Sequence, residues 1–251
     1  GNSPIGKDQS GNGNDFTPVN FGGSNSIEKA TGALPILNTV NGGTTATATV
    51  REDANASNLI FALPLAGDIT EVTPRINNAR TALSFTDSGS TSAIDYNFYG
   101  ASRNFDGSND FLKASIPDSD ALHLQASSWT VECWFNADAL PGGSDVYLGG
   151  VRLAPVSANS DVCWNLRIYN NVIEGMWNTA NTQYKTVSPY AITATKWTHV
   201  AWVRDGNEQR LYQDGVLVVT SSHTTTPNLN NSSFLEIGGR TGSGFFNGKI
   251  Q

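Results

Sequence analysis

The chain has 251 residues, of which 38% are hydrophobic and only 15% are charged, so Asn, Ser, Thr and Gly supply much of its polar character. Its formal net charge is -7, and its 15 Lys and Arg residues are scattered singly, which argues against nucleic acid or a membrane as a partner. No run of about 18 apolar residues is present, so we expect no membrane-spanning helix.

Residues 1–57 are predicted to form an extended arm, because Gly, Asn, Ser and Pro dominate their composition. Such a segment buries too little apolar surface to offset its own ordering entropy, so we expect the arm to dock on another surface. Within it, residues 44–50 alternate Thr with Ala and predict a short strand. The continuous apolar run Asn58–Leu65 predicts a strand that is buried on both faces and opens the main domain, residues 58–251.

After Phe85, short apolar segments are separated by turn signals roughly every eight to twelve residues, a spacing typical of a sandwich or barrel. Arg103–Ser115 predicts a hairpin around the turn residues DGSND. Trp129–Asn136 is the clearest strand, and the side chains expected on one of its faces are those of Trp129, Val131, Cys133 and Phe135.

The remaining strands are predicted at Val146–Leu153, Val162–Tyr169, Val172–Trp177, Trp197–Arg204, Gln209–Gln213, Val216–Ser222, Phe234–Gly239 and Phe245–Gln251. Asn170-Asn171, Asp205-Gly206 and Asp214-Gly215 are the predicted tight turns, because these residue types tolerate the positive φ angles of two-residue hairpin loops. No segment shows sustained helical periodicity. The fold class is therefore predicted to be all-β.

Cys133 and Cys163 both lie in apolar, strand-like segments. Two interpretations stay open: buried free thiols that pack as small hydrophobic groups, or a cross-strand disulfide. Two cysteines do not make a disulfide framework or a zinc site.

Four segments, in order, resemble the laminin-G-like branch of the concanavalin A-like jelly rolls: NFDGSNDFL (104–112), SSWTVECWFNAD (127–138), KWTHVAWVRDGNEQRLYQDGVLV (196–218) and FLEIGGRTGSGFFNGKIQ (234–251). The resemblance covers residues from about 59 to 251. It implies a two-sheet antiparallel jelly-roll sandwich preceded by the extended arm. Because the family usually continues past the position of Gln251 into a further strand, the domain is expected to continue beyond residue 251.

The arm sequence DQSGNGNDFTPVNF (8–21) is similar to a segment that precedes such domains in structural proteins of marine bacteriophages. This resemblance implies a non-enzymatic virion structural protein: a fibre, tail or capsid-decorating component. Its expected partners are other virion subunits, with homo-oligomer formation, and host surface glycans. The alternatives are a secreted or cell-surface bacterial adhesin or carbohydrate-binding module and, third, a glucanase-like hydrolase.

Hydrolases of the related jelly roll carry carboxylates at alternate positions of one strand, and a glycosidase needs two of them about 5–9.5 Å apart. Glu132 and Glu174 are the nearest candidates, but neither has an acidic residue two positions away. There is no G-x-S-x-G motif to pair with a histidine. We therefore predict no catalytic residues.

Two binding sites are predicted. Laminin-G-like modules often hold calcium at a loop rim, so calcium is the one cofactor considered, with Asp106 and Asp110 of DGSND as its ligands. Acidic residues beside glycine are also common turn formers. The second site is for carbohydrate, where an aromatic ring and amide groups occur beside a loop: Trp177, Asn178, Asn181 and Tyr184.

Overall fold

The computed structural model describes residues 39–41, 51–53, 55–97, 100–117, 120–153, 162–179, 182–227 and 233–251. The chain divides into two compact units. The first unit contains Gly1–Ala62 and Val72–Ala82, and the second contains Leu63–Glu71 and Leu83–Gln251. None of the helices in these described ranges is long and apolar enough to cross a bilayer. The strand predicted at residues 44–50 lies outside the described residues.

The first unit contains two short parallel strands, β1 (Thr39–Asn41) and β2 (Arg51–Asp53), which pair with each other. A 3-10 helix, η1 (Ala56–Asn58), and a single-turn helix, α1 (Thr73–Ile76), follow in the sequence. Pro74 occupies the first turn of α1, where its missing N–H costs nothing. The small core of this unit consists of Ala56, Ala62, Val72 and Ile76, with Leu59 packed against it.

The strand predicted at Asn58–Leu65 is wrong: Asn58 ends η1, and the residues after it join no sheet. Local contacts satisfy the backbone instead. The N–H of Ala62 donates to the Thr73 hydroxyl at 2.7 Å, and its carbonyl accepts from the Val72 N–H at 2.9 Å. Leu65 has a φ of +51°, which interrupts any extended conformation there.

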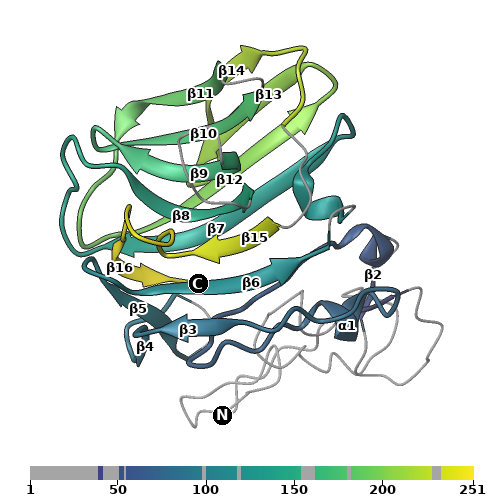
Figure 1. Cartoon of the computed structure of the whole chain (residues 1–251), viewed down its shortest axis with the longest axis horizontal. Coiled ribbons are helices and arrows are strands. Elements are labelled where there is room, and N and C mark those ends of the chain that lie inside the picture. Colours follow the sequence, from purple (N-terminus) through teal and green to yellow (C-terminus); the bar gives the residue numbers. More distant parts are fainter. Residues whose placement is uncertain are drawn as a thin grey trace, which may run out of the picture. The chain divides into compact units, whose positions relative to one another are not determined.

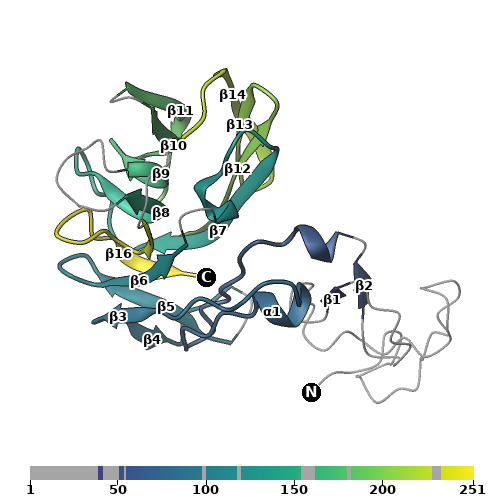
Figure 2. The same ribbon diagram turned by 45° about the vertical axis from the view of Figure 1, so that its right-hand side comes forward.

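The described strands of the second unit form two antiparallel sheets of seven strands each, which confirms the predicted two-sheet jelly-roll sandwich (Figures 1 and 2). Sheet 1 runs in spatial order through β11 (Thr182–Ala191), β10 (Val172–Thr179), β9 (Val162–Tyr169), β8 (Val146–Leu153), β15 (Ser233–Ile237), β6 (Phe111–Ile116) and β3 (Thr86–Ser88). Sheet 2 runs through β14 (Val216–Ser222), β13 (Glu208–Gln213), β12 (Trp197–Asp205), β7 (Trp129–Ala137), β16 (Asn247–Ile250), β5 (Ser102–Asp106) and β4 (Thr91–Ala93). A 3-10 helix, η2 (Ala121–His123), precedes β7.

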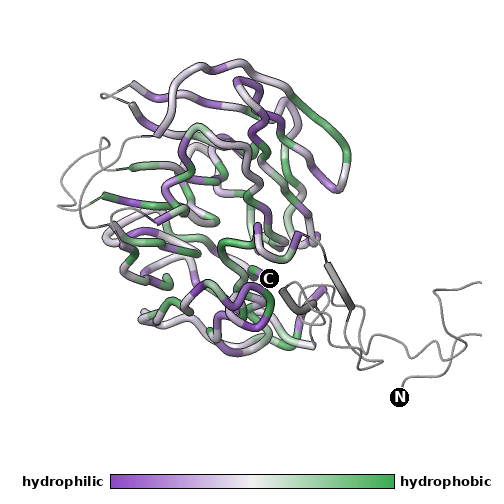
Figure 3. Tube along the Cα trace, turned by 90° about the vertical axis from the view of Figure 1, so that its right-hand side faces the viewer, coloured by the Kyte–Doolittle hydropathy of each residue, from purple (hydrophilic) through white to green (hydrophobic). Residues whose placement is uncertain are grey.

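The core of the second unit lies between the two sheets. Trp177 of sheet 1 stacks on Trp202 of sheet 2 with ring centroids 5.8 Å apart, and both indoles are fully buried. Gly175 lies beside them, and a Cβ at that position would overlap the Trp202 ring, so the flat indole contacts the strand backbone directly. Hydrophobic and hydrophilic residues alternate along many strands, as expected when one face of each sheet packs inward (Figure 3).

The predicted grouping of Val131, Cys133 and Phe135 on one face of β7 is confirmed, and the register with β12 shows that this face points inward. Val131 pairs with Trp202, and Cys133 pairs with Val200, which is fully buried. Phe135, on the same face, is also fully buried and contacts Phe246 edge-on at 6.2 Å.

Two of the three predicted hairpin turns are confirmed. Asn170 and Asn171 have φ angles of +51° and +64° and join β9 to β10, while Asp214 and Gly215 have φ angles of +50° and +78° and join β13 to β14. Between β12 and β13 the turn is displaced by one residue, because Asp205 pairs with Glu208. Its two central residues are therefore Gly206 and Asn207, and not Asp205 and Gly206.

The hairpin predicted at Arg103–Ser115 is wrong. Both of its strands exist, but β5 belongs to sheet 2, where it pairs with β16 and β4, and β6 belongs to sheet 1, where it pairs with β15 and β3. The DGSND segment is a corner that carries the chain from one sheet to the other. Turn residues indicate a change of direction, but they do not say whether the flanking strands pair.

Both cysteines are free thiols, Cys133 on sheet 2 and Cys163 on sheet 1. Desolvation, with a smaller contribution from the charge of Glu132, raises the pKa of the Cys133 thiol to about 12. Burial also raises the pKa of Cys163, whose thiol donates to the His123 carbonyl at 3.6 Å. Both side chains therefore stay protonated at neutral pH and pack as small hydrophobic groups.

Candidate functional site

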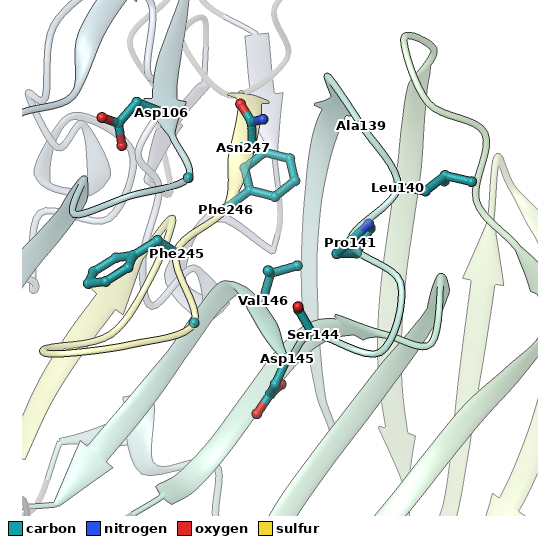
Figure 4. A pocket seen from close by; sticks show the side chains of 12 residues that line it. Asp106, Ala139, Leu140, Pro141, Ser144, Asp145, Val146, Phe245, Phe246 and Asn247 are labelled. Carbon is teal, nitrogen blue, oxygen red and sulfur yellow. The ribbon is translucent and has the colours of Figure 1, made fainter.

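A pocket of about 390 Å³ opens where three connections of the second unit meet (Figure 4). The connections are the β5–β6 corner, the β7–β8 loop and the β15–β16 loop. Their residues that line the pocket are Asp106, Gly107, Ala139, Leu140, Pro141, Ser144, Asp145, Val146, Gly244, Phe245, Phe246 and Asn247. We call this the rim pocket. Its volume lies in the range that small-molecule sites occupy.

Close backbone packing builds one wall of the rim pocket. Gly107 has a φ of +76°, and a Cβ there would lie 2.8 Å from the Cβ of Asn247, so only glycine lets the corner approach the start of β16. The Asp106 carboxylate holds the corner by accepting from the N–H groups of Ser108 at 2.7 Å and Asn109 at 3.3 Å. The carboxylate therefore has a fixed position at the edge of the pocket.

Asp145 supplies the second carboxylate of the rim pocket. Its Oδ2 accepts a hydrogen bond from Arg167 Nη1 at 3.1 Å, and its side chain is 30% exposed. Its Oδ1 atom is buried and has no hydrogen-bond partner among the described residues. A buried acceptor without a donor is unfavourable by about 1–3 kcal/mol, so this oxygen can accept a hydrogen bond from a group that enters the pocket.

The rim pocket combines apolar walls with acceptors. Leu140 is 47% exposed, and the rings of Phe245 and Phe246 lie across the pocket from it (Figure 4). Among the described residues that line the pocket, none is Lys, Arg or His. The lining therefore offers apolar contact and hydrogen-bond acceptors. Its charged groups are the carboxylates of Asp106 and Asp145, and Asp145 is paired with Arg167, which lies outside the lining.

The two predicted calcium ligands, Asp106 and Asp110, lie close together in the β5–β6 corner. The Asp106 N–H donates to Asp110 Oδ2 at 3.0 Å, so both carboxylates act as acceptors for the backbone of the corner. Burial, with the nearby charge of Asp106, raises the pKa of Asp110 although its bond from the Asp106 N–H opposes that shift. Within the described ranges, no group of three or more His, Cys, Asp or Glu residues is placed to hold a metal ion. The calcium site stays a prediction.

Three of the four residues predicted to bind carbohydrate are described, and these three are not presented together on the surface. The Trp177 indole is fully buried against Trp202, so neither of its faces is available for stacking. Asn178 is buried, and strand alternation places it on the opposite face of β10. Tyr184 is half-buried and stacks on Trp177 with centroids 6.1 Å apart, while Asn181 lies outside the described residues. This carbohydrate site stays a prediction.

The two glutamates considered as catalytic acids lie on different sheets. Glu132 is exposed on sheet 2, where its Oε2 lies 3.5 Å from His199 Nε2, and the hydrogen bond with His199 lowers the pKa of Glu132 although desolvation opposes this effect. Glu174 lies on sheet 1 and forms an ion pair with Arg167 at 2.6 Å. The two carboxyl groups therefore do not form a pair across one cleft.

Sequence reasoning missed most of the rim pocket. Asp106 was singled out, but Asp145, Leu140 and Phe245 were not. The available signal was the Gly-rich character of PGGSD (141–145) and GRTGSG (239–244), which marks long turns at one end of the strands. Nothing in the sequence shows that these two loops meet.

Two antiparallel seven-stranded sheets with a pocket at their connecting loops define a concanavalin A-like jelly roll. The chain belongs to the Laminin_G_3 family, described as the concanavalin A-like lectin/glucanases superfamily, whose model matches residues 106–251. No curated protein matches the sequence.

Among solved structures, the chain is similar to the binding domain of Paraclostridial Mosquitocidal Protein 1, with a TM-score of 0.56 and 13% identity over 78% of this chain and 47% of that one. It is also similar to domain 4 of AbnA, a GH43 extracellular arabinanase from Geobacillus stearothermophilus, in complex with arabinotriose. The TM-score is 0.52 and the identity 14%, over 73% of this chain and 84% of that one.

A third similar structure is that of botulinum neurotoxin type C, whose cell entry is described as dependent on interaction with two ganglioside molecules. Its TM-score is 0.52 and its identity 11%, over 78% of this chain and 48% of that one. The chain spans about half the length of the toxin chains that it matches. At these identities the likeness shows only that this chain shares its fold with these structures.

Proposed function

We propose that this chain is a non-enzymatic carbohydrate-binding jelly roll and that the rim pocket holds a neutral saccharide. One observation carries the proposal: Leu140, Phe245 and Asp145 line the same pocket, and the buried Oδ1 of Asp145 has no hydrogen-bond partner among the described residues. Sugars present apolar C–H faces to apolar and aromatic side chains, and their hydroxyl groups donate hydrogen bonds to carboxylates.

Charge defines the class of saccharide. Asp106 and Asp145 line the rim pocket, and none of its described lining residues is cationic. A sialic acid, uronic acid or sulfate group would therefore be placed against like charge, which is unfavourable. Uncharged hexoses and pentoses match the acceptors without that penalty.

The rim pocket is tested by binding measurements on a glycan array and by titration of the best neutral glycan. Leu140→Asp removes an apolar wall and adds a third negative charge, so we expect its affinity to fall by about tenfold or more. The matched control is Leu217→Asp, because Leu217 is 48% exposed on β14 and Leu140 is 47% exposed. Equal losses in both variants, or binding to acidic glycans only, would contradict the proposal.

We further propose that the chain is a virion structural protein, a fibre, tail or capsid-decorating component that binds other virion subunits and assembles as a homo-oligomer. The resemblance of residues 8–21 to a segment of marine bacteriophage structural proteins supports this context. A secreted or cell-surface adhesin is the alternative, and it would use the same rim pocket. Calcium at Asp106 and Asp110 remains part of the proposal.

Quantitative mass spectrometry distinguishes these two locations. Purified virus particles are expected to contain the chain at a fixed copy number relative to their major capsid protein. Recovery of the chain from cell surfaces, with none in washed particles, would instead favour the adhesin.

A further inference from the structure

A second polar and aromatic surface lies on the outer face of sheet 2, and it shares no residue with the rim pocket. It is formed where β12, β7 and β16 lie side by side and Asp95, which follows β4, contacts their side chains. We call it the Asp95 face, and its residues are Asp95, Trp134, Asn136, Trp197, His199 and Lys249.

Strand register brings these side chains together. Asn136 pairs with Trp197 on one side and with Lys249 on the other, and Trp134 pairs with His199. Directly paired residues of antiparallel strands project from the same face of the sheet. Phe135, which alternates with them, points into the core, so the four paired side chains on β7 and β12 point away from it.

The Asp95 face presents rings that are not fully covered. Trp134, Trp197 and His199 are half-buried, and the rings of Trp134 and His199 lie 5.1 Å apart. Tyr96, beside Asp95, is 46% exposed. Partly exposed indole and phenol rings provide the apolar contact that the C–H faces of a pyranose need.

The Asp95 carboxylate is fixed beside these rings. Its Oδ1 accepts from Trp197 Nε1 at 3.1 Å, its Oδ2 accepts from Asn136 Nδ2 at 3.4 Å, and Lys249 Nζ lies 3.8 Å from Oδ2. The Asp95 side chain is nevertheless 52% exposed. A carboxylate has about four acceptor positions, so one remains directed to solvent next to the indole.

Asn136 gives an independent reason to expect a ligand here. The residue is only 6% exposed, and its Oδ1 atom is buried with no hydrogen-bond partner within the described part of the chain. A buried amide oxygen needs a donor. Trp197 Nε1 donates to Asp95 and Lys249 Nζ donates to Asp138 at 2.5 Å, and neither donates to Asn136 Oδ1. A ligand hydroxyl supplies that donor.

The charges of the Asp95 face limit the chemistry of the ligand. Lys249, the cation of this face, lies beside the carboxylates of Asp138 and Asp95, and the His199 ring lies beside the Glu132 carboxylate. An anionic ligand would have to displace one of these carboxylates. A neutral, hydroxyl-rich molecule would not.

We propose that the Asp95 face is a second saccharide site, specific for neutral sugars and independent of the rim pocket. The Trp134 and Trp197 rings contact the sugar, the Asp95 carboxylate accepts from one hydroxyl, and Asn136 Oδ1 accepts from another. The chain then binds glycans at two places, which raises its avidity for a surface that carries many copies.

Nuclear magnetic resonance tests this proposal directly, because the indole N–H of Trp197 gives its own signal and Trp197→Phe assigns it. Glucose, galactose, N-acetylglucosamine and their trisaccharides are titrated up to about 20 mM, a range that suits weak sugar binding. The Trp197 signal is expected to shift with at least one of these sugars, and the shift is expected to persist in Leu140→Asp, which disables only the rim pocket.

Three variants examine the residues. Asn136→Leu and Trp134→Ala are each expected to weaken the sugar affinity obtained from the Trp197 shift by about tenfold or more. The control is Tyr190→Ala, which removes an aromatic side chain that is 60% exposed on β11 and is expected to leave this affinity unchanged. Thermal melting confirms that each variant is folded. The second site would be overturned if no sugar shifted the Trp197 signal of the wild type, or if the shift were lost in Leu140→Asp. It would also be overturned if the shift were retained in both Asn136→Leu and Trp134→Ala. Loss of array binding in Leu140→Asp with a retained Trp197 shift would separate the two proposals.

Discussion

Glu174→Ala is expected to destabilise the sandwich by about 3 kcal/mol, at the lower end of the cost of breaking a buried ion pair. Glu174 and Arg167 face each other on β10 and β9, and their side chains are only 6% and 7% exposed. Arg167 Nε and Nη2 both donate to Glu174 Oε2, at 2.9 and 2.6 Å. Without that carboxylate, Arg167 loses both of these hydrogen bonds and keeps its ion pair with the partly exposed Asp145, so its buried charge is only partly compensated.

The pKa of Arg167 reflects two opposing effects, the burial of the guanidinium and its attraction to the neighbouring carboxylates. Burial by itself would lower the pKa of this guanidinium, but the charge of Asp145 and the hydrogen bond and charge of Glu174 raise it above its usual value. Arg167 is therefore charged at neutral pH. It does not lose its proton to relieve the loss of Glu174.

Urea unfolding measures the change in the free energy of unfolding. The control is Glu208→Ala, which removes the partner of Arg210 at an exposed site and is expected to cost less than about 1 kcal/mol. The double variant Arg167→Met with Glu174→Met removes both charges and is expected to unfold within about 1 kcal/mol of the wild type. If the single and double variants were equally unstable, the loss would come from packing and not from the unpaired charge.

Trp202→Ala is expected to destabilise the protein by about 3–5 kcal/mol, because it leaves a large cavity between the sheets. The Trp202 side chain is fully buried, meets Trp129 edge-on at 4.7 Å and stacks on Trp177. It is one of the contacts through which β12 packs on β10. The control is Tyr190→Ala at the exposed end of β11, for which a change of no more than about 0.5 kcal/mol is expected.

Gly175 tests whether the Trp202 ring lies where the structure places it. Gly175→Ala puts a methyl group into the Trp202 indole, so it is expected to cost about 1–3 kcal/mol in the wild type. In the Trp202→Ala background the ring is gone, and the same substitution should cost much less. Urea unfolding of the four proteins in this cycle gives the coupling energy; additive losses would mean that the ring does not contact Gly175.

Strand positions and strand faces could be predicted because they depend on local patterns. The apolar alternation in β7 was sufficient to place Val131, Cys133 and Phe135 on one face. The Asp214-Gly215 turn was predictable because few residue pairs accept positive φ at both positions. The strand prediction for Asn58–Leu65 was wrong because a short, continuous apolar run has no periodicity. Such a run fits a buried strand and a loop packed in a core equally well.

The candidate sites were much less predictable, because each is assembled across sheets and loops. The rim pocket joins Asp106, Asp145 and Phe245, which are far apart in the sequence and share no motif. Trp177 looked like a surface platform because it stands beside Asn178, but adjacent residues of a strand point to opposite faces. Alternation identifies two faces and does not say which of them the other sheet covers.

The amino-acid sequence by itself therefore determined an all-β chain, most of its strands, their alternating faces and two of its tight turns, since these follow from backbone preferences and side-chain periodicity over a few residues. Only the tertiary structure decided that β15 lies between β6 and β8 and that β16 lies between β5 and β7. It also sent the two strands around DGSND into different sheets. Long-range pairing depends on which surfaces bury each other when the whole chain packs, and that free energy is shared among residues that no local pattern connects.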